Sequence, residues 1–527
     1  MGKRILIAAN YYPPTVIGGA EIVAHRHAKL LLERGYSVSV FTRDRNISSE
    51  SNYVDMIDGI NVTRFHSTKS FPENNFIIPE AASCFEALLK SSKPDIVHFH
   101  NVVELGVNLI RLAKARGFKT VLTLHDPWGF CMRHTLIRDE GNICEYFDQC
   151  ASCQWDIATG NGYRIPIRLR SDYIRWCVSK ADVMISPSSW LKANYEKAGY
   201  DQSHIVKLSN GANLNAVIPI LRTSRTCLQF LYVGTIADHK GVDYLLDAAA
   251  KLLAVPELNG RWQLTLAGDG PKKGMIVARI RELQTEAISY IGSVEHAELM
   301  QSLSRYDVVI LPSIWPENQS AVLLEAMASG AAQIATALGG NAELVEHAKS
   351  GFLVTPRSAA ALANAMRIMI EEPDLLERFS AQNLARRSVF DDNNTVAKLI
   401  EFYDRLELRT VSDDQLIICA GGEPPPEVAW LINTYSSGTQ LRSKVTLMWE
   451  EWATDYEWQK ACAVWNWGSV VDSRAVAGAR KFKLPLLIPD DPSCNCNTLT
   501  DVRLLTYGDA SEALSQIDGL VATRRLM

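Results

Sequence analysis

One structural pattern occurs twice in this chain, first over residues 4–42 and again over residues 228–267. Each copy reads as a buried apolar strand, a loop that contains glycine, an amphipathic helix and a second apolar strand. Strands that alternate with helices predict a doubly wound α/β domain with a parallel sheet, whose ligands bind beyond the carboxyl ends of the strands. The repeat therefore predicts two such domains. The expected strands are Arg4–Ala9, Ser37–Phe41, Leu228–Val233 and Trp262–Ala267, and the expected helices are Glu21–Arg34 and Val242–Leu253.

Length and composition set limits on the function. The 527 residues are too many for one hydrophobic core, and 47% hydrophobic with 21% charged residues is typical of a globular protein. A formal net charge of −5 argues against a general nucleic-acid partner. Met1-Gly-Lys-Arg4 leads directly into a strand instead of a signal-peptide core, and no apolar run is long enough to cross a membrane. We therefore expect a cytoplasmic protein.

Two glutamates, Glu317 and Glu325, form the most specific chemical pattern of the chain. Glu317 lies on a loop after an apolar strand, and Glu325 lies on the helix expected at Ser320–Ser329. The N-terminus of such a helix presents free N–H groups and a positive dipole end, which suit a diphosphate. Glu325 can then accept hydrogen bonds from ribose hydroxyls, as a carboxylate does in dinucleotide-binding folds. The pattern predicts a nucleotide-sugar site.

This pattern resembles the E-x7-E signature of the retaining glycosyltransferases of family 4. The other segments that carry the resemblance, which covers roughly residues 1–408, are Pro13–Glu21, Asp95–Asn101, Leu124–Asp126, Asp182–Ser188, Tyr232–Gly241, Leu266–Pro271, Ile291–Val294 and Gly339–Glu343. The resemblance implies the GT-B architecture, in which two Rossmann-like domains face each other across a cleft. Residues 1–215 would form the acceptor domain and residues 216–394 the donor domain, with a crossover near residues 210–221. A helix at 395–408 would pack back on the first domain.

The resemblance also implies roles for single residues. Lys240 would neutralise the diphosphate, His125 would lie beside the donor sugar, and Glu317 would contact that sugar and organise the basic residues. These three are the candidate catalytic residues. The candidate donor-binding residues are Gly18, Gly19, Gly234, Gly292, Val294, Asn318, Ser320, Ala321, Val322 and Glu325. Gly18 and Gly19 would let the backbone approach the phosphates, while Gly292 and Val294 would offer backbone groups to the base.

The chain departs from the family pattern at Thr235, where an arginine is usual. Lys272 or Lys273 could replace the missing cation, although a solvated pair of loop lysines is the interpretation we favour. The family is thought to react by front-face attack, in which the leaving diphosphate helps to deprotonate the acceptor and fixed charges stabilise it. The resemblance therefore predicts no metal or other cofactor for catalysis.

Four of the eleven cysteines are close together in the sequence, namely Cys131, Cys144, Cys150 and Cys153. A reducing compartment makes disulfides a weak explanation. A Cys-x2-Cys pair with two further cysteines nearby suits a structural zinc site that would hold together a loop with little core of its own. Free thiols and a redox pair are the alternatives that remain open.

Residues 163–180 mix basic and apolar side chains at helical spacing. Such a helix could lie on an anionic membrane, which would place the protein at the inner membrane face. We favour a helix that packs on the first domain with its arginines in solvent.

Residues 411–527 lie outside the resemblance and read as a small α/β accessory domain without catalytic residues. Its six tryptophans, Trp430, Trp449, Trp452, Trp458, Trp465 and Trp467, indicate a packed core more readily than a sugar-stacking surface.

The whole sequence thus predicts a retaining glycosyltransferase of the hexosyltransferase type. Its donor would be a UDP-, GDP- or ADP-sugar, and its acceptor a glycan or lipid-linked glycan of surface polysaccharide biosynthesis. The alternatives are a GT-B nucleotide-sugar epimerase and a non-catalytic sugar-binding or scaffold subunit. Whether the chain forms a homo-oligomer is left open.

Overall fold

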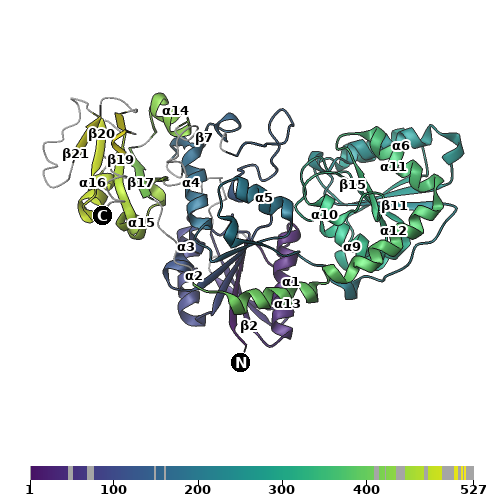
Figure 1. Ribbon diagram of the computed structural model, residues 1–527, viewed down its shortest axis with the longest axis horizontal. Helices are drawn as coiled ribbons and strands as arrows, with labels where there is room; N and C mark the ends of the chain where they lie inside the picture. Colours follow the sequence, from purple (N-terminus) through teal and green to yellow (C-terminus); the bar gives the residue numbers. More distant parts are fainter. Residues whose placement is uncertain are drawn as a thin grey trace.

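The computed structural model contains three separate, mainly parallel sheets, each flanked by helices (Figure 1). The structure describes residues 2–44, 52–67, 76–147, 150–159, 162–408, 415–421, 423–434, 445–467, 473–489, 504–507, 512–513 and 515–517. We refer to the chain around the first, second and third sheet as the first, second and third unit. The start expected for the third unit, at residue 411, lies outside the described residues.

The first sheet has the order β10-β9-β6-β5-β1-β2-β4-β3, and its neighbouring strands are parallel except for β3 and β4. Its strands are β1 (Arg4–Ala9), β2 (Ser37–Arg43), β3 (Tyr53–Ile57), β4 (Ile60–Phe65), β5 (Ile96–His100), β6 (Lys119–Thr123), β9 (Val183–Ser186) and β10 (Ile205–Lys207). The helices of this unit are α1 (Gly19–Glu33), α2 (Pro79–Ser92), α3 (Asn108–Ala115), α4 (Ile167–Val178) and α5 (Ser189–Lys197). A small antiparallel pair, β7 (Asp156–Ala158) and β8 (Arg164–Pro166), precedes α4.

The second sheet has the order β13-β12-β11-β14-β15-β16 and is parallel throughout. Its strands are β11 (Leu228–Val233), β12 (Trp262–Ala267), β13 (Ile288–Gly292), β14 (Val308–Leu311), β15 (Ala332–Thr336) and β16 (Gly351–Val354). The helices are α6 (Val242–Leu253), α7 (Lys273–Glu282), α8 (His296–Ser302), α9 (Ala321–Ser329), α10 (Asn341–Leu344), α11 (Ala359–Glu371) and α12 (Pro373–Arg386). The strands of this sheet are mostly apolar, because helices cover both faces of a parallel sheet and bury the side chains on each of them.

The strand order reverses once in each of these two sheets. The reversal falls between β1 and β5 in the first sheet and between β11 and β14 in the second. Loops that leave adjacent strands at such a point run to opposite faces of the sheet and open a crevice at the carboxyl ends, which is where doubly wound folds bind ligands. The two Rossmann-like units expected from the repeated sequence pattern are confirmed.

Helix α13 (Asp392–Arg405) returns from the second unit and packs on α1 of the first unit (Figure 1). Tyr403 on this helix is fully buried, and its hydroxyl lies 2.6 Å from Nδ1 of His98 in the first sheet. The returning segment also meets the outgoing one, because Ala212 donates to Phe390 at 2.7 Å and accepts from Asp392 at 3.0 Å. The two chain crossings therefore run side by side.

The third sheet has the order β18-β17-β19-β20-β21, and its paired strands are parallel. Its elements are β17 (Gln415–Ala420), α14 (Pro426–Thr434), β18 (Val445–Trp449), α15 (Asp455–Lys460), β19 (Ala461–Asn466), α16 (Ser473–Phe482), β20 (Leu486–Pro489) and β21 (Leu504–Tyr507). Five of the six tryptophans are buried, as a core interpretation requires, while Trp430 is 57% exposed.

Helix α4 lies between the first and third units, and our expectation that its arginines lie in solvent is wrong. Arg168 and Arg170 are buried, and α4 packs against β18 and α14 (Figure 1). Asp172 on α4 accepts the N–H of Leu447 in β18 at 3.2 Å. The basic and apolar residues of this helix are enclosed by protein, so α4 does not offer the surface on which the membrane alternative was based.

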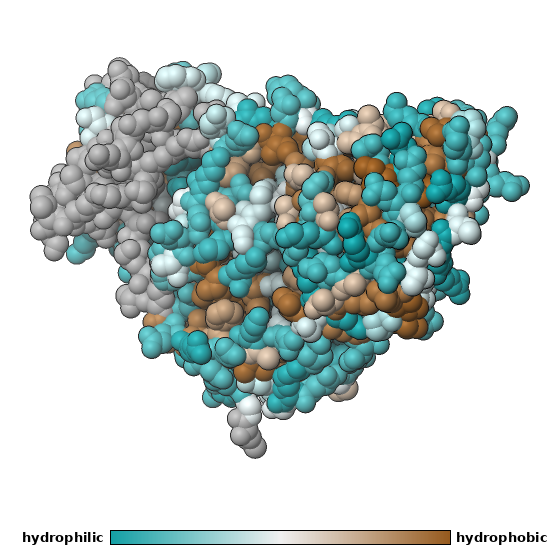
Figure 2. All heavy atoms as spheres, turned by 45° about the vertical axis from the view of Figure 1, so that its right-hand side comes forward, coloured by the Kyte–Doolittle hydropathy of each residue, from teal (hydrophilic) through white to brown (hydrophobic). Residues whose placement is uncertain are grey.

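Among the described helices, none combines the length and the apolar character that crossing a membrane requires. The face shown in Figure 2 is mostly hydrophilic, and its apolar residues lie in several separate patches.

Candidate active site

The loop after β14 gathers three hydrogen-bond donors around one carboxylate oxygen. Oε1 of Glu317 accepts from Nζ of Lys240 at 2.7 Å, from the Ser313 hydroxyl at 2.7 Å and from Nε1 of Trp315 at 2.8 Å. Lys240 follows β11 and Glu317 follows β14, so the pair spans the strand reversal of the second sheet. The sequence pattern predicted both residues, and the fold brings them into contact.

Charge and ring contacts hold this cluster together. Burial raises the pKa of the Glu317 carboxyl, but Lys240 and the hydrogen bonds from Ser313 and Trp315 outweigh it, so the pKa lies below its usual value. Nζ of Lys240 also lies 4.7 Å from the centre of the Trp315 ring, within range of a cation–π contact. The result is a fixed ammonium group whose neighbours keep Glu317 ionised.

Glu325 on α9 has a partner that the sequence did not indicate. The side chain of Glu325 is buried, and its Oε1 lies 2.9 Å from Nε2 of His296 at the start of α8. The hydrogen bond with Glu325 raises the pKa of His296, against the effect of burial. His296 is half-exposed and therefore covers Glu325 on its open side.

Helix α9 begins at the same loop. The Ser320 hydroxyl caps it by accepting the N–H of Leu323, and Gly330 ends it with a left-handed φ of 83°. Because the first turn of a helix has no internal acceptors, the N–H groups of Ala321 and Val322 point out of this end. With the helix dipole they form an anion-binding end next to Glu317.

Close backbone packing fixes the loop that carries Glu317 and Asn318. The N–H of Gly340 donates to the Glu317 carbonyl at 2.6 Å. A Cβ atom at Gly339 would lie 2.1 Å from the Glu317 carbonyl oxygen, and one at Gly340 would lie 1.8 Å from that of Asn318. Only glycine permits this approach, so the Gly339-Gly340 pair fixes the position of the loop.

The remaining glycines that the sequence proposed for donor binding occupy varied positions. Gly18 precedes α1, its φ of −156° is extended, and its N–H donates to Glu21 at 2.9 Å. Cβ atoms at Gly19 and Gly292 would meet nothing within 4 Å, so open space lies in front of both. Gly234 approaches Gly268 so closely that a Cβ at Gly268 would lie 1.9 Å from the Gly234 oxygen. Val294 is partly buried against the core below α8.

His125 follows β6 in the first sheet and lies, partly buried, at the end of a row of buried histidines, His27, His98 and His100. Its Nε2 lies 3.1 Å from Nδ1 of His100, and the His100 ring packs against His98 and His27. Burial lowers the pKa of His125 to about 4, although Asp126 acts in the opposite direction. His125 is therefore neutral near pH 7. In its hydrogen bond with His100, either Nε2 of His125 or Nδ1 of His100 carries the proton and donates, and the other nitrogen accepts.

The first and second units contact each other through polar groups at the mouth of the site. The Asn318 amide donates to the His125 carbonyl, and Oε1 of Gln319 accepts the N–H of Asn210 at 2.7 Å. The carboxylate of Glu343 accepts the N–H groups of Ser189 and Trp190 at 3.0 and 2.9 Å. Glu343 was noted in the sequence only as part of a motif. Because its partners are in the other unit, the local pattern could not show that it caps α5.

The cations near Thr235 do not fill the place of the missing arginine. Thr235 is exposed, and its carbonyl accepts from Tyr232 at 2.9 Å. Lys272 binds Asp238 and Asp243, while Lys273 binds Asp269 at 2.9 Å. In this structure both lysines are engaged by surface carboxylates, as the interpretation we favoured requires.

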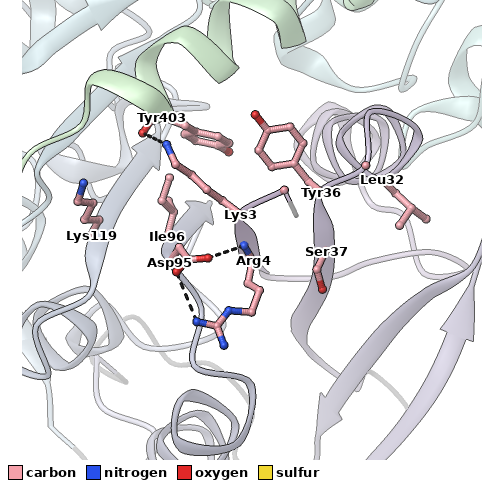
Figure 3. Close-up of a pocket in the computed structure, with 11 residues that line it drawn as sticks. Lys3, Arg4, Leu32, Tyr36, Ser37, Asp95, Ile96, Lys119 and Tyr403 are labelled. Atoms are coloured by element: carbon pink, nitrogen blue, oxygen red, sulfur yellow. Dashed lines mark hydrogen bonds and ion pairs between the residues drawn. The ribbon is translucent and has the colours of Figure 1, made fainter.

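One hollow of the first unit lies away from these groups. It measures about 950 Å³ and lies at the amino ends of β1 and β5, beside Tyr36 and Tyr403 (Figure 3). Its lysines are engaged, since Lys3 donates to Tyr403 and Lys119 to Leu406. The hollow is at the end of the sheet opposite to the strand carboxyl ends, so we do not assign it a role.

Comparisons with known proteins agree with this geometry. Residues 17–216 match the family described as Glycosyltransferase Family 4, and residues 221–386 match the family described as Glycosyl transferases group 1. Glycogen synthase of Mycobacterium tuberculosis is 25% identical over 413 residues, which cover 75% of this chain and 92% of that protein.

Two solved structures show the same fold. Sucrose-phosphate synthase from Thermosynechococcus elongatus superposes with a TM-score of 0.59 at 19% identity, over 77% of this chain and 99% of that chain. Anabaena Alr3699/HepE in complex with UDP-glucose superposes with a TM-score of 0.56 at 19% identity, over 77% of this chain and all of that chain. The GT-B architecture is confirmed, and the third unit lies outside the matched family regions.

Proposed function

Since the chain belongs to the family 4 type glycosyltransferases of the GT-B fold, we propose that it transfers a hexose from a nucleoside diphosphate sugar to a hydroxyl of a glycan or glycolipid, with retention of the anomeric configuration. The observation that carries the proposal is the cluster of Lys240, Glu317 and the N-terminus of α9 at the strand reversal of the second sheet. A dinegative diphosphate is the ligand that such a set of donors suits best.

In this proposal the second unit binds the donor. Glu325 accepts hydrogen bonds from the ribose, with His296 holding the carboxylate in place from the open side. Lys240 and the first turn of α9 bind the diphosphate and stabilise the negative charge that develops on it as the sugar bond breaks. Neutral His125 faces this region from the first unit, where it can hydrogen-bond a sugar hydroxyl without adding charge.

The acceptor enters from the first unit, and its hydroxyl attacks from the face that the diphosphate leaves. The leaving diphosphate oxygen is then the nearest base for the hydroxyl proton. Retention follows without a carboxylate nucleophile. Glu325 is too remote for that task if it binds ribose, and Glu317 is already held by three donors. We further propose a role in surface polysaccharide assembly, on the basis of the family resemblance alone.

The test begins with the donor. Calorimetric titration with UDP, GDP and ADP selects the base, and UDP-glucose is the first sugar donor to assay because the Anabaena structure carries it. Glu325→Gln should weaken nucleotide binding about ten- to hundredfold, the range expected for losing a charged hydrogen-bond acceptor. Glu298→Gln, an exposed acid on the neighbouring α8, is the matched control and should bind normally.

Product analysis then separates the alternatives. NMR of the first-formed product should show the anomeric configuration of the donor, and inversion would contradict the proposed mechanism. Release of nucleoside diphosphate and an isomerised sugar without any acceptor would instead identify an epimerase. Failure to bind any of the three nucleotides would favour a non-catalytic subunit.

A further inference from the structure

The segment between β6 and α4 forms one small cavity that is lined by four cysteines. The cavity measures about 40 Å³, and the cysteines are Cys131, Cys144, Cys150 and Cys153. About 10–15 Å³ suffices for one water molecule, so this space holds a single small ion and excludes a substrate. The rest of the wall is largely apolar, with Phe130, Met132, Leu136, Ile137, Phe147 and Ile167.

We propose that these four cysteines bind one structural Zn²⁺ ion. The thiols come from three separate turns of the segment, and each reaches the same enclosed space. Sulfur ligands in a closed four-coordinate set are typical of structural zinc. Binding displaces up to four thiol protons to solvent and requires no oxidant, since the sulfur atoms stay at the thiolate level.

The surroundings of the cavity suit a cluster with four thiolates. A zinc ion with four thiolates carries a net charge of about −2, and Arg138 and Arg170 line the same cavity. A terminal nitrogen of Arg138 lies 3.8 Å from the sulfur of Cys144. The backbone N–H groups of Arg133 and Leu136 also donate hydrogen bonds to Cys131. These donors are already in place to stabilise a metal-bound sulfur.

The sulfurs are farther apart than a bound ion allows. Among the described residues, the groups with three donor atoms within 4.8 Å of one another do not include these cysteines. Cys144 and Cys150 instead donate to backbone carbonyls of Tyr146 and Phe147 at 3.5 Å. Zinc would replace these weak bonds and draw the turns together around a Zn–S distance of about 2.3 Å.

The segment contacts all three units, so an ion that stiffens it would stabilise contacts with each of them. Arg357 of the second unit donates to the Gly141 carbonyl at 2.5 Å. Asn433 of the third unit donates to the Trp155 carbonyl at 2.8 Å. In the first unit, Tyr200 donates to the Gly129 carbonyl at 2.7 Å. A segment stiffened by zinc would keep these three contacts in register across the mouth of the site.

The test is elemental analysis of full-length protein purified without a metal-affinity tag. About one zinc ion per chain is expected for a closed four-cysteine site. The double variant Cys150→Ser, Cys153→Ser should lose the metal, and Cys227→Ser, which changes a partly buried cysteine outside the cavity, should keep it. In metal-free protein, titration with Co²⁺ should give the sulfur-to-metal charge-transfer absorption and the intense visible bands of a tetrahedral thiolate site.

If the double variant does not fold, the Co²⁺ titration is repeated with the single variant Cys144→Ser. Its spectrum should lose part of the sulfur-to-metal absorption, because one thiolate ligand is missing. Zinc-free protein whose four thiols react freely with a thiol reagent would overturn the proposal. So would a disulfide among the four cysteines in protein prepared under reducing conditions.

Discussion

The chain has two joints between its units, and they are built in opposite ways. The second unit meets the first through separate polar contacts, which involve Asn318, Gln319, Glu343 and Arg357. The third unit shares a continuous hydrophobic core with the first, in which residues of α3 and α4 cluster with those of β17, β18 and β19. The first kind of contact can be broken in water at little cost, while the second cannot.

The difference indicates which parts of the molecule can move. The proposed exchange of a nucleotide sugar for a nucleotide requires the cleft to open, and the polar contacts beside the paired crossings at Ala212 and Phe390 allow that motion. The third unit holds α4 in a fixed position, and the Phe76, Tyr173 and Trp452 rings pack together in this region. The accessory domain that the sequence suggested is thus an integral part of the core of the first unit.

The largest predicted effect concerns the apolar joint. Arg111 on α3 and Glu457 on α15 form a 2.8 Å ion pair with side chains only 8% and 1% exposed. Glu457→Ala should destabilise the protein by about 3–5 kcal/mol, because it removes a buried carboxylate that pairs with the buried Arg111 guanidinium and caps α15. Chemical denaturation followed by tryptophan fluorescence measures this.

The control for this experiment is Asp455→Ala on the same helix. Asp455 pairs with Lys481, and both side chains are largely exposed, at 72% and 58%. Its loss should cost less than about 1 kcal/mol. Equal and small effects of the two substitutions would show that the third unit is attached as loosely as the second.

The next effect belongs to the second unit. Lys240→Ala removes the ammonium group that we place on the diphosphate, so nucleotide affinity and turnover should each fall about ten- to hundredfold. Lys251→Ala, an exposed lysine on α6, is the control and should leave both unchanged. Calorimetry and steady-state kinetics provide the measurements. Normal turnover in the Lys240 variant would remove this residue from the site.

A third prediction concerns the first unit, to which both joints connect. His27 is fully enclosed, neither of its ring nitrogens has a hydrogen-bond partner among the described residues, and burial lowers its pKa to about 3. The unfolded state therefore binds more protons than the folded state between about pH 6.5 and pH 3, so stability falls as the pH falls through this window. His27→Phe should remove up to about 1.4 kcal/mol per pH unit of this dependence.

Urea denaturation at several pH values between 4 and 7 tests the prediction. The control is His204→Gln, which changes a partly exposed histidine outside this row of histidines. An unaltered acid sensitivity in the His27 variant would mean that this ring reaches solvent or a proton donor in the folded protein.

Local sequence predicted most of the two Rossmann-like units. Strands Leu228–Val233 and Trp262–Ala267 and helix Val242–Leu253 have the bounds that their apolar patterns indicated. A buried parallel strand needs a continuous apolar run, and a loop that contains glycine marks its end. The residues that predict such a strand therefore lie within a few positions of one another in the sequence. The roles expected of Lys240 and Glu317 came from the family resemblance, and the structure explains their contact, since both lie beyond the carboxyl ends of adjacent strands.

The residues that the sequence did not reveal depend on partners far along the chain. Arg168 and Arg170 look solvent-exposed in isolation, because the strand that covers their helix follows more than two hundred residues later. His296 has no motif of its own and becomes a site residue only because α8 begins beside Glu325. Long-range packing of this kind leaves no periodic signal in a local window.

The smallest predicted effect tests the polar joint itself. Glu343 receives two backbone N–H groups at the start of α5 and the ammonium group of Lys207 at 2.5 Å, and these donors keep its pKa below the usual value despite burial. Glu343→Gln keeps the shape and removes the charge, so the free energy of unfolding should change by less than about 1 kcal/mol. The Michaelis constant for the donor should still rise, because closure of the cleft loses one of its contacts.

The control is Glu346→Gln, which changes an acid of the same unit that pairs with Arg386 inside that unit. It should leave the Michaelis constant unchanged. If Glu343→Gln unfolded the protein as readily as Glu457→Ala, the two joints would be equally rigid, and opening of the cleft would have to occur elsewhere.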